Sequence, residues 1–154
     1  MAPRQDLITA IGLATQAFQR STAAFDDAVG EGMSLNRTDL RCLDWLFDGP
    51  KAAGQLAAAI GLSSAATTTL LDRLERRGLV RRVRDAVDRR KVLVEMTELC
   101  WRQIGEYYTP LAEEGARLLE QYADEQLTAM RDHLLTSTEL IDRHRLRIRG
   151  GAGA

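Results

Sequence analysis

The sequence predicts a mainly α-helical (α+β) protein with one small β element near its middle. Apolar residues recur at intervals of three and four over most of the 154 residues, which is the period of amphipathic helices. After Gly78 the pattern changes to short Val- and Leu-rich runs typical of strands. The composition, 45% hydrophobic and 28% charged, is that of an ordinary globular chain, and the length suits a single domain, 1–154.

The sequence gives no sign of export or of a membrane anchor. No run approaches the ~20 apolar residues that a membrane span needs, and the N-terminus lacks the pattern of a signal peptide. Cys42 and Cys100 stand far apart, without a CxxC pair, so we expect two reduced thiols. The sequence therefore predicts a cytoplasmic protein with no membrane partner.

The first predicted element is one long amphipathic helix over residues 5–29. Its apolar stripe is narrow, as in a helix-packing seam, and a break is expected at the "GEG" of residues 30–32. The stripe consists of Leu7, Ile11, Ala14, Phe18 and Phe25.

Three shorter helices are expected next. Asn36 is a plausible N-cap for the first, with Asp39 three residues on as the second half of a capping box, and "DGP" at residues 48–50 ends that helix. The segment "AAGQLAAAIG" predicts a short helix, and after a turn at "GLS" another helix opens at Ser63. Two short helices joined by a tight turn containing glycine indicate a helix-turn-helix unit, whose second helix enters the major groove of DNA.

The second helix of this unit has two predicted faces. Thr67, Leu70, Leu71 and Leu74 recur at the spacing of a buried face. The opposite face, near the N-terminus where base edges are read, carries Ser64, Ala65, Thr68, Thr69 and Asp72.

A basic hairpin follows Gly78. The runs "LVRRVR" and "VLVEMT" predict two paired strands joined by a protruding tip at residues 85–91. Nine basic and three acidic residues lie between Arg73 and Lys91, a net charge of +6, whereas the rest of the chain carries −7. A solvated charged face is one interpretation of this run. Beside a recognition helix, however, Arg89 and Arg90 would reach the neighbouring minor groove, so residues 34–97 are predicted to form a winged helix-turn-helix.

Residues 61–98 resemble the MarR (multiple antibiotic resistance regulator) family of bacterial winged-helix transcription factors. The family patterns "LxxRLExxGLVxR" and "DxxDRRxxxxxLT" are matched by Leu70, Arg73, Leu74, Gly78, Leu79, Val80, Asp88, Arg89, Arg90 and Thr97. The resemblance implies that Asp88 orients a wing arginine, in the first place Arg90. It also implies that double-stranded DNA is contacted by Ser64, Thr68, Thr69, Arg73, Arg84, Asp88, Arg89 and Arg90.

The sequence departs from that family in two places, the exposed face of the second helix and Cys100. Many members carry Arg, Gln or Asn on the exposed face of the recognition helix, where this chain has Ser, Ala and Thr. These small side chains favour contact with thymine methyl groups, and we expect more readout of DNA shape. Cys100 replaces a common glycine, and we interpret it as a small buried hydrophobe in preference to an oxidation sensor.

Residues 98–148 are predicted to form two helices with a turn at "YADEQ", followed by a disordered Gly-rich tail at 149–154. The apolar stripes of 5–29 and 98–148 exceed what so small a domain buries alone, so both are assigned to a helical dimerisation region. A long helix folded back on its own domain is the alternative. A two-fold homodimer would present its recognition helices roughly 34–36 Å apart, which predicts a pseudo-palindromic operator.

Other chemistry finds little support in the sequence. His133 and His144 lack companion ligands at metal-binding spacing, and no phosphate loop or nucleophile motif is present, so no metal, cofactor or enzymatic activity is expected. The family resemblance implies a small aromatic or lipophilic effector, for which Phe18 and Trp45 are candidate wall residues. We expect a homodimeric repressor or activator. Repressors are the more common of the two in this family. A helical interaction module that has lost specific DNA binding and a thiol-based redox-responsive regulator remain as alternatives.

Overall fold

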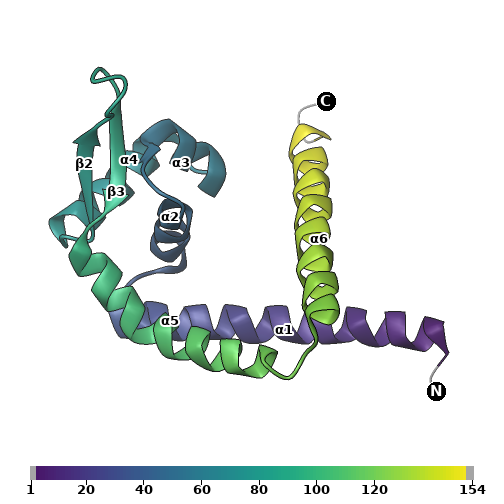
Figure 1. Cartoon of the computed structure of the whole chain (residues 1–154). Coiled ribbons are helices and arrows are strands. Elements are labelled where there is room, and N and C mark those ends of the chain that lie inside the picture. The colour runs from purple at the N-terminus through teal and green to yellow at the C-terminus, as the bar shows by residue number, and fades with distance from the viewer. Residues whose placement is uncertain (1–2, 152–154) are drawn as a thin grey trace. The chain divides into compact units, whose positions relative to one another are not determined.

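Helices make up most of the chain, as the sequence predicts. A computed structural model describes residues 3–151. Its elements in chain order are α1 (Arg4–Met33), α2 (Arg37–Phe47), β1 (Lys51–Ala52), α3 (Ala53–Ile60), α4 (Ser64–Arg76), β2 (Val80–Arg84), β3 (Val92–Met96), α5 (Glu98–Leu119) and α6 (Asp124–Gly151) (Figure 1). The chain divides between Tyr107 and Tyr108, so that α1 to β3 and the start of α5 form one unit and the rest of α5 with α6 forms another.

Helix α1 runs past the glycines that were expected to end it. It continues to Met33, and Ser34 terminates it in the left-handed conformation with φ 53°. Gly30 is buried inside the helix, where an added β-carbon would lie 2.9 Å from the carbonyl oxygen of Leu35. This glycine therefore allows the following turn to pack closely on the helix, and the predicted break at residues 30–32 is wrong.

The caps of the next helices match the sequence signals. Asn36 and Asp39 form a reciprocal capping box: the Asn36 side chain accepts from the Asp39 amide at 2.9 Å, and the Asp39 carboxylate accepts from the Asn36 amide at 3.2 Å. Gly61 ends α3 with φ 81°, and the Ser63 hydroxyl accepts from the amide of Ala66 at the start of α4. The two helices and the turn between them thus lie where the sequence places them.

The sheet has one strand more than predicted. β2 and β3 pair antiparallel, with Val80 opposite Met96 and Arg84 opposite Val92, as the two runs indicate. The two-residue strand β1 adds to the other edge of β3, which gives the order β1-β3-β2. β1 is too short to show a periodicity, which is why the sequence did not reveal it.

The core of the first unit lies between α2, α3, α4 and the sheet. Thr67, Leu70, Leu71 and Leu74 form the buried face of α4, as predicted. The most deeply buried large side chains around them include Leu43, Leu46, Leu56, Leu79 and Val94. This packing fixes α4 against the sheet and leaves the opposite face of the helix in solvent.

The second unit consists of the rest of α5, a turn and helix α6 as far as residue 151. The turn between α5 and α6 falls at residues 120–123 and overlaps only the first two residues of the predicted turn at 122–126, since residues 124–126 already belong to α6. Helix α6 continues through Arg149 to Gly151. The predicted disorder is therefore wrong for residues 149–151, and residues 152–154 of that predicted tail lie outside the described residues. Between residues 3 and 151, no helix is both long and apolar enough to cross a membrane.

Candidate nucleic-acid interface

The N-terminal half of α4 offers a face of small side chains to solvent. Ser64, Ala65, Thr68 and Thr69 are exposed, whereas Thr67 between them is buried. The Thr68 hydroxyl donates to the carbonyl of Ser64 at 3.0 Å and the Thr69 hydroxyl to that of Ala65 at 3.1 Å. Because these protons are used within the helix, what the threonines offer outward is an acceptor oxygen and a methyl group.

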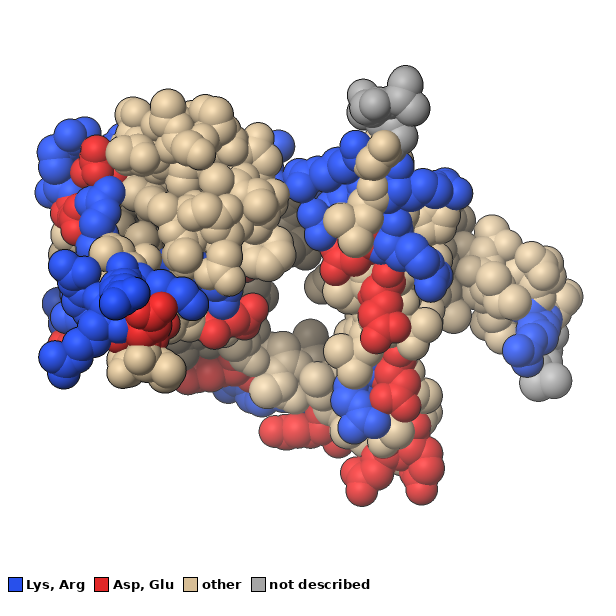
Figure 2. Space-filling model, turned by 90° about the horizontal axis from the view of Figure 1, so that it is seen from above, with Lys and Arg blue, Asp and Glu red and all other residues tan. Residues whose placement is uncertain are grey.

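The helix-turn-helix carries no charged side chain from the start of α3 to the middle of α4. Residues 52–71, which span α3 and the first part of α4, contain no acidic, basic or histidine side chain. The hairpin of β2 and β3 is the wing, and the loop of residues 85–91 is its tip. Figure 2 shows an uncharged surface at the helix-turn-helix, with basic side chains gathered beside it on the part of the unit that carries the wing. Electrostatic attraction to phosphates must therefore come mainly from β2 and from the loop between β2 and β3, which carry the basic residues of the hairpin.

Two aspartates shape the loop at the wing tip. The Asp85 carboxylate accepts from the amides of Val87 at 2.7 Å and Asp88 at 2.8 Å, and the Asp85 amide donates to the Lys91 carbonyl at 3.0 Å. The hydrogen bonds from the Asp88 and Val87 amides lower the pKa of Asp85, so the carboxylate stays ionised at neutral pH. The turn is thus held by a charged acceptor inside the loop.

Asp88 acts on Arg90 through the backbone. Its carboxylate accepts from the Arg90 amide at 3.1 Å and lies 4.0 Å from the Lys91 ammonium. The family resemblance had implied that Asp88 orients the Arg90 side chain. The contact that the structure contains orders the main chain from which that side chain projects.

The wing tip presents arginines with free guanidinium groups. Arg89 and Arg90 are exposed, and their guanidiniums have no ion-pair or hydrogen-bond partner within residues 3–151. Arg84, on β2, donates to the carbonyl of Arg89 at 3.1 Å and so joins the strand to the main chain of the loop. Free guanidiniums on an ordered loop are suited to phosphate contacts and to the minor groove.

Other cations of the basic run are used within the protein. Arg73 pairs with Asp39, whose side chain is only 4% exposed, and the Nε of Arg73 is buried without a hydrogen-bond partner. Arg82 pairs with Asp72 at 2.6 Å and with Glu75, which ties β2 to α4. The hydrogen bond from Arg82 to Asp72 raises the pKa of the guanidinium. Sequence reasoning placed Arg73 in the DNA-contacting set and missed its role between α2 and α4, because its partner lies 34 residues away.

Comparison with known proteins agrees with this geometry. Residues 35–92 match the sequence model of the MarR family. The HTH-type transcriptional regulator YcgE of Bacillus subtilis (strain 168) is 36% identical over 118 residues, which cover 74% of this chain and 77% of YcgE. The chain belongs to the MarR family. It is accordingly a helix-turn-helix transcriptional regulator that binds DNA, and the expectation that it is not an enzyme is confirmed by the family.

Solved structures show the same MarR fold. A MarR family protein from Bacillus stearothermophilus matches with a TM-score of 0.65 at 23% identity, covering 92% of this chain and 99% of that one. A variant of MepR from S. aureus, bound to an oligodeoxyribonucleotide, matches with a TM-score of 0.55 at 18% identity, covering 85% of this chain and 97% of that one.

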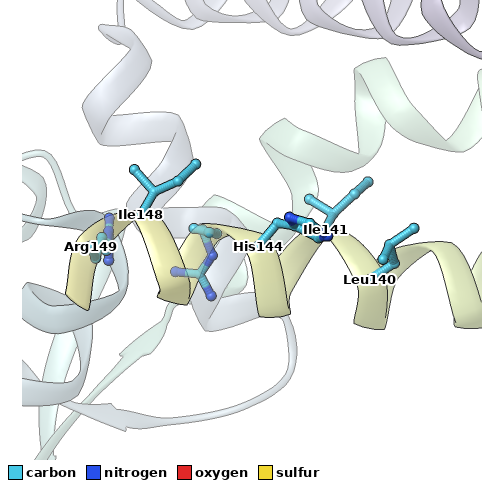
Figure 3. Close-up of a pocket in the computed structure, with 6 residues that line it drawn as sticks. Leu140, Ile141, His144, Ile148 and Arg149 are labelled. Carbon is cyan, nitrogen blue, oxygen red and sulfur yellow. The ribbon is translucent and has the colours of Figure 1, made fainter. Parts of the chain in front are cut away.

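The two predicted effector residues of this MarR-family chain lie on exposed helix surfaces. Phe18 on α1 is 69% exposed and Trp45 on α2 is 37% exposed. A separate groove lies on α6, where Ile141 and Ile148 project from the same side of the helix (Figure 3). Its other lining residues are Leu140, His144, Arg145 and Arg149. Neither Phe18 nor Trp45 lines this groove, and their place in an effector site stays a prediction.

The cysteines of this regulator are buried thiols, as we interpreted Cys100. Neither Cys42 nor Cys100 has exposed surface. Burial raises the pKa of Cys42 to about 12 and that of Cys100 to about 11, so both thiols are protonated at neutral pH. His133 and His144 are exposed, and no group of three metal-ligating side chains occurs in the described part of the chain.

Proposed function

We propose that this MarR-family regulator is a cytoplasmic homodimeric repressor that binds a pseudo-palindromic operator and is released by a small aromatic or lipophilic effector. The observation that carries the proposal is the exposed face of α4 beside a wing whose tip holds two free guanidiniums. In this arrangement Ser64, Thr68 and Thr69 face the major groove. Arg89 and Arg90, on a loop shaped by Arg84, Asp85 and Asp88, reach the adjacent minor groove and phosphates.

Arg73 enters this proposal indirectly. Its guanidinium is paired with Asp39, so its contribution to DNA binding is to hold α4 against α2. The MepR variant, which shares the fold, is bound to an oligodeoxyribonucleotide, and this supports DNA as the partner in the proposal.

The proposed homodimer follows from apolar surface that the single chain leaves in solvent. On α1, Leu7, Ile8, Ile11, Leu13 and Phe18 are each more than half exposed. The exposed apolar residues of α6 are Met130, Leu134, Leu135, Leu140, Ile141, Leu146 and Ile148. Apolar stripes of this extent on long helices are typical of subunit interfaces, and sedimentation equilibrium of the full chain tests the assignment.

The decisive experiment is binding to the intergenic DNA upstream of the protein's own gene, titrated against salt. If the wing contacts phosphates, log affinity should fall linearly with log salt, with a slope near −0.9 for each phosphate contact. A shuffled duplex of equal length is the control and should bind much more weakly. Equal and weak binding to both duplexes would favour the interaction module with a winged-helix fold.

Effector release is tested on the same complex. A panel of small aromatic and lipophilic acids should contain compounds that lower operator affinity, because a ligand that prefers one dimer conformation shifts the population toward it. Lack of response across the panel would remove the effector from the proposal. The buried, protonated thiols give no support to the redox-responsive alternative.

A further inference from the structure

One arginine joins α4, the recognition helix of the helix-turn-helix unit, to the end of α1. Arg77 is the C-cap residue of α4. Its Nη1 donates to the carbonyl of Ser34 at 2.8 Å and its Nη2 to the carbonyl of Met33 at 2.6 Å. Met33 is the last residue of α1 and Ser34 is its C-cap, so a single planar guanidinium bridges the ends of two helices that are more than forty residues apart in sequence.

The Arg77 guanidinium places a positive charge at the C-terminal end of α1. The last carbonyls of a helix have no intrahelical partner and carry partial negative charge, so a cation there is favourable. α1 has no basic residue in its own last turn. Two hydrogen bonds from one planar guanidinium also restrict its orientation, which a lysine ammonium would not do.

Two further ion pairs complete a ring of three helices. Arg37 at the start of α2 binds Asp27 of α1 through hydrogen bonds of 2.6 to 3.1 Å. Asp39 of α2 binds Arg73 of α4. With α1 joined to α2, α2 to α4, and α4 back to α1 through Arg77, rotation of α4 relative to α1 must break at least one charged contact.

We propose that Arg77 is a positioning residue that sets the angle between the recognition helix and α1, and through it the spacing of the two recognition helices on the operator. The inference rests on the proposed function, in which α1 belongs to the dimer interface. Arg77 acts through α4 and makes no base contact itself. Its neighbour Arg76, exposed and without a partner within residues 3–151, provides a control of the same charge.

The direct test measures the angle without DNA. Spin labels at Gln16→Cys on α1 and Ala65→Cys on α4, both exposed positions, report their distance within one chain by pulsed electron paramagnetic resonance, with unlabelled protein added in excess. Arg77→Met should broaden the distance distribution, and Arg76→Met should leave it unchanged. An unchanged distribution in Arg77→Met would overturn the proposal, whether or not the protein binds DNA.

The second test separates positioning from a general loss of stability. The duplex protected by the wild-type protein is compared with its half-site and with versions that have one base pair inserted or removed at the centre. Arg77→Met should bind the full site roughly tenfold more weakly or worse, keep its half-site affinity, and discriminate less between spacings. Equal losses on full and half sites would show a merely structural role and reject the positioning role.

Two outcomes keep the proposals distinguishable. If the wild-type protein binds all sequences equally, the proposed function fails, while the spin-label distances still decide what Arg77 does. If Arg77→Met does not fold, Arg77→Lys serves in its place: it keeps the charge without the forked contact and should show the same broadening to a smaller extent.

Discussion

The recognition helix and the wing adjoin one another but differ in chemistry. The exposed half of α4 offers hydroxyl oxygens and methyl groups on a segment without any charge, and the wing tip offers free guanidiniums on a loop held by carboxylates. The difference separates the two requirements of an operator-binding protein: small uncharged groups read base edges, and cations supply salt-dependent affinity. Variants of α4, of the wing and of the residues that support them test this division.

The largest effect is expected at the arginine that belongs to neither surface. Arg73→Met leaves the Asp39 carboxylate buried without its cation, which should lower the free energy of unfolding by about 3 kcal/mol. Urea denaturation measures it, with Arg76→Met as the control for loss of an exposed charge. If stability were unchanged and only DNA affinity fell, Arg73 would belong with the wing cations.

The contribution of the wing to DNA affinity is tested by removing both free guanidiniums. Arg89→Ala with Arg90→Ala should weaken binding to every duplex by a similar factor and reduce the salt slope by about two, one for each phosphate contact. Because Asp85 and Asp88 hold the loop through backbone amides, the fold should be unaffected. A change of sequence preference with an unaltered salt slope would contradict the division.

The recognition helix is tested by removing methyl groups from the DNA. Replacing single thymines of the operator by deoxyuridine should weaken binding about fourfold wherever a thymine methyl packs on α4, since burying one such group contributes roughly 0.8 kcal/mol. Thr69→Ser removes the methyl on the protein side and should abolish this sensitivity at its own contact. Thr69→Val retains a methyl and should preserve it; the reverse result would assign the readout to the hydroxyl.

The smallest effect concerns acid. Asp85 has a pKa lowered by the amides of Asp88 and Val87, so its contribution to wing order is present above the ordinary carboxyl range and is lost as pH falls through the lowered value. Between pH 6 and 8 the amide resonances of Val87 and Asp88 should therefore not move, and loss of wing order should begin only below about pH 4. Asp85→Ala should show the disordered pattern at neutral pH. Titration near pH 6 would rule out Asp85 as the group responsible.

Local signals predicted most of the fold, and long-range contacts account for what they missed. The capping box of Asn36 and Asp39, the cap at Ser63 and the buried face of α4 depend on neighbours within four residues, and they are confirmed. In the expected break at residues 30–32, Gly32 lies against the side chain of Tyr107, a residue of α5, and β1 exists only because β3 lies beside it. Neither contact leaves a periodic pattern in the sequence.

The candidate site shows the same limit. The exposed positions of α4 follow from helix periodicity, and the resemblance marks Asp88, Arg89 and Arg90. Which arginines of the basic run are free does not follow, because Arg73, Arg77 and Arg82 acquire their partners only in the folded chain.

The uncharged face of α4 bears on how this regulator can change in evolution. Within residues 3–151, the side chains of Ser64, Ala65, Thr68 and Thr69 form no hydrogen bond or ion pair outside their own helix. The arginines that join α4 to α2 and to β2 lie elsewhere. Exchanges at these four positions should therefore cost little stability, since surface substitutions usually stay within about 0.5 kcal/mol. After gene duplication, a lineage could acquire a new operator there, one residue at a time, while the scaffold and its affinity for DNA stay as they are.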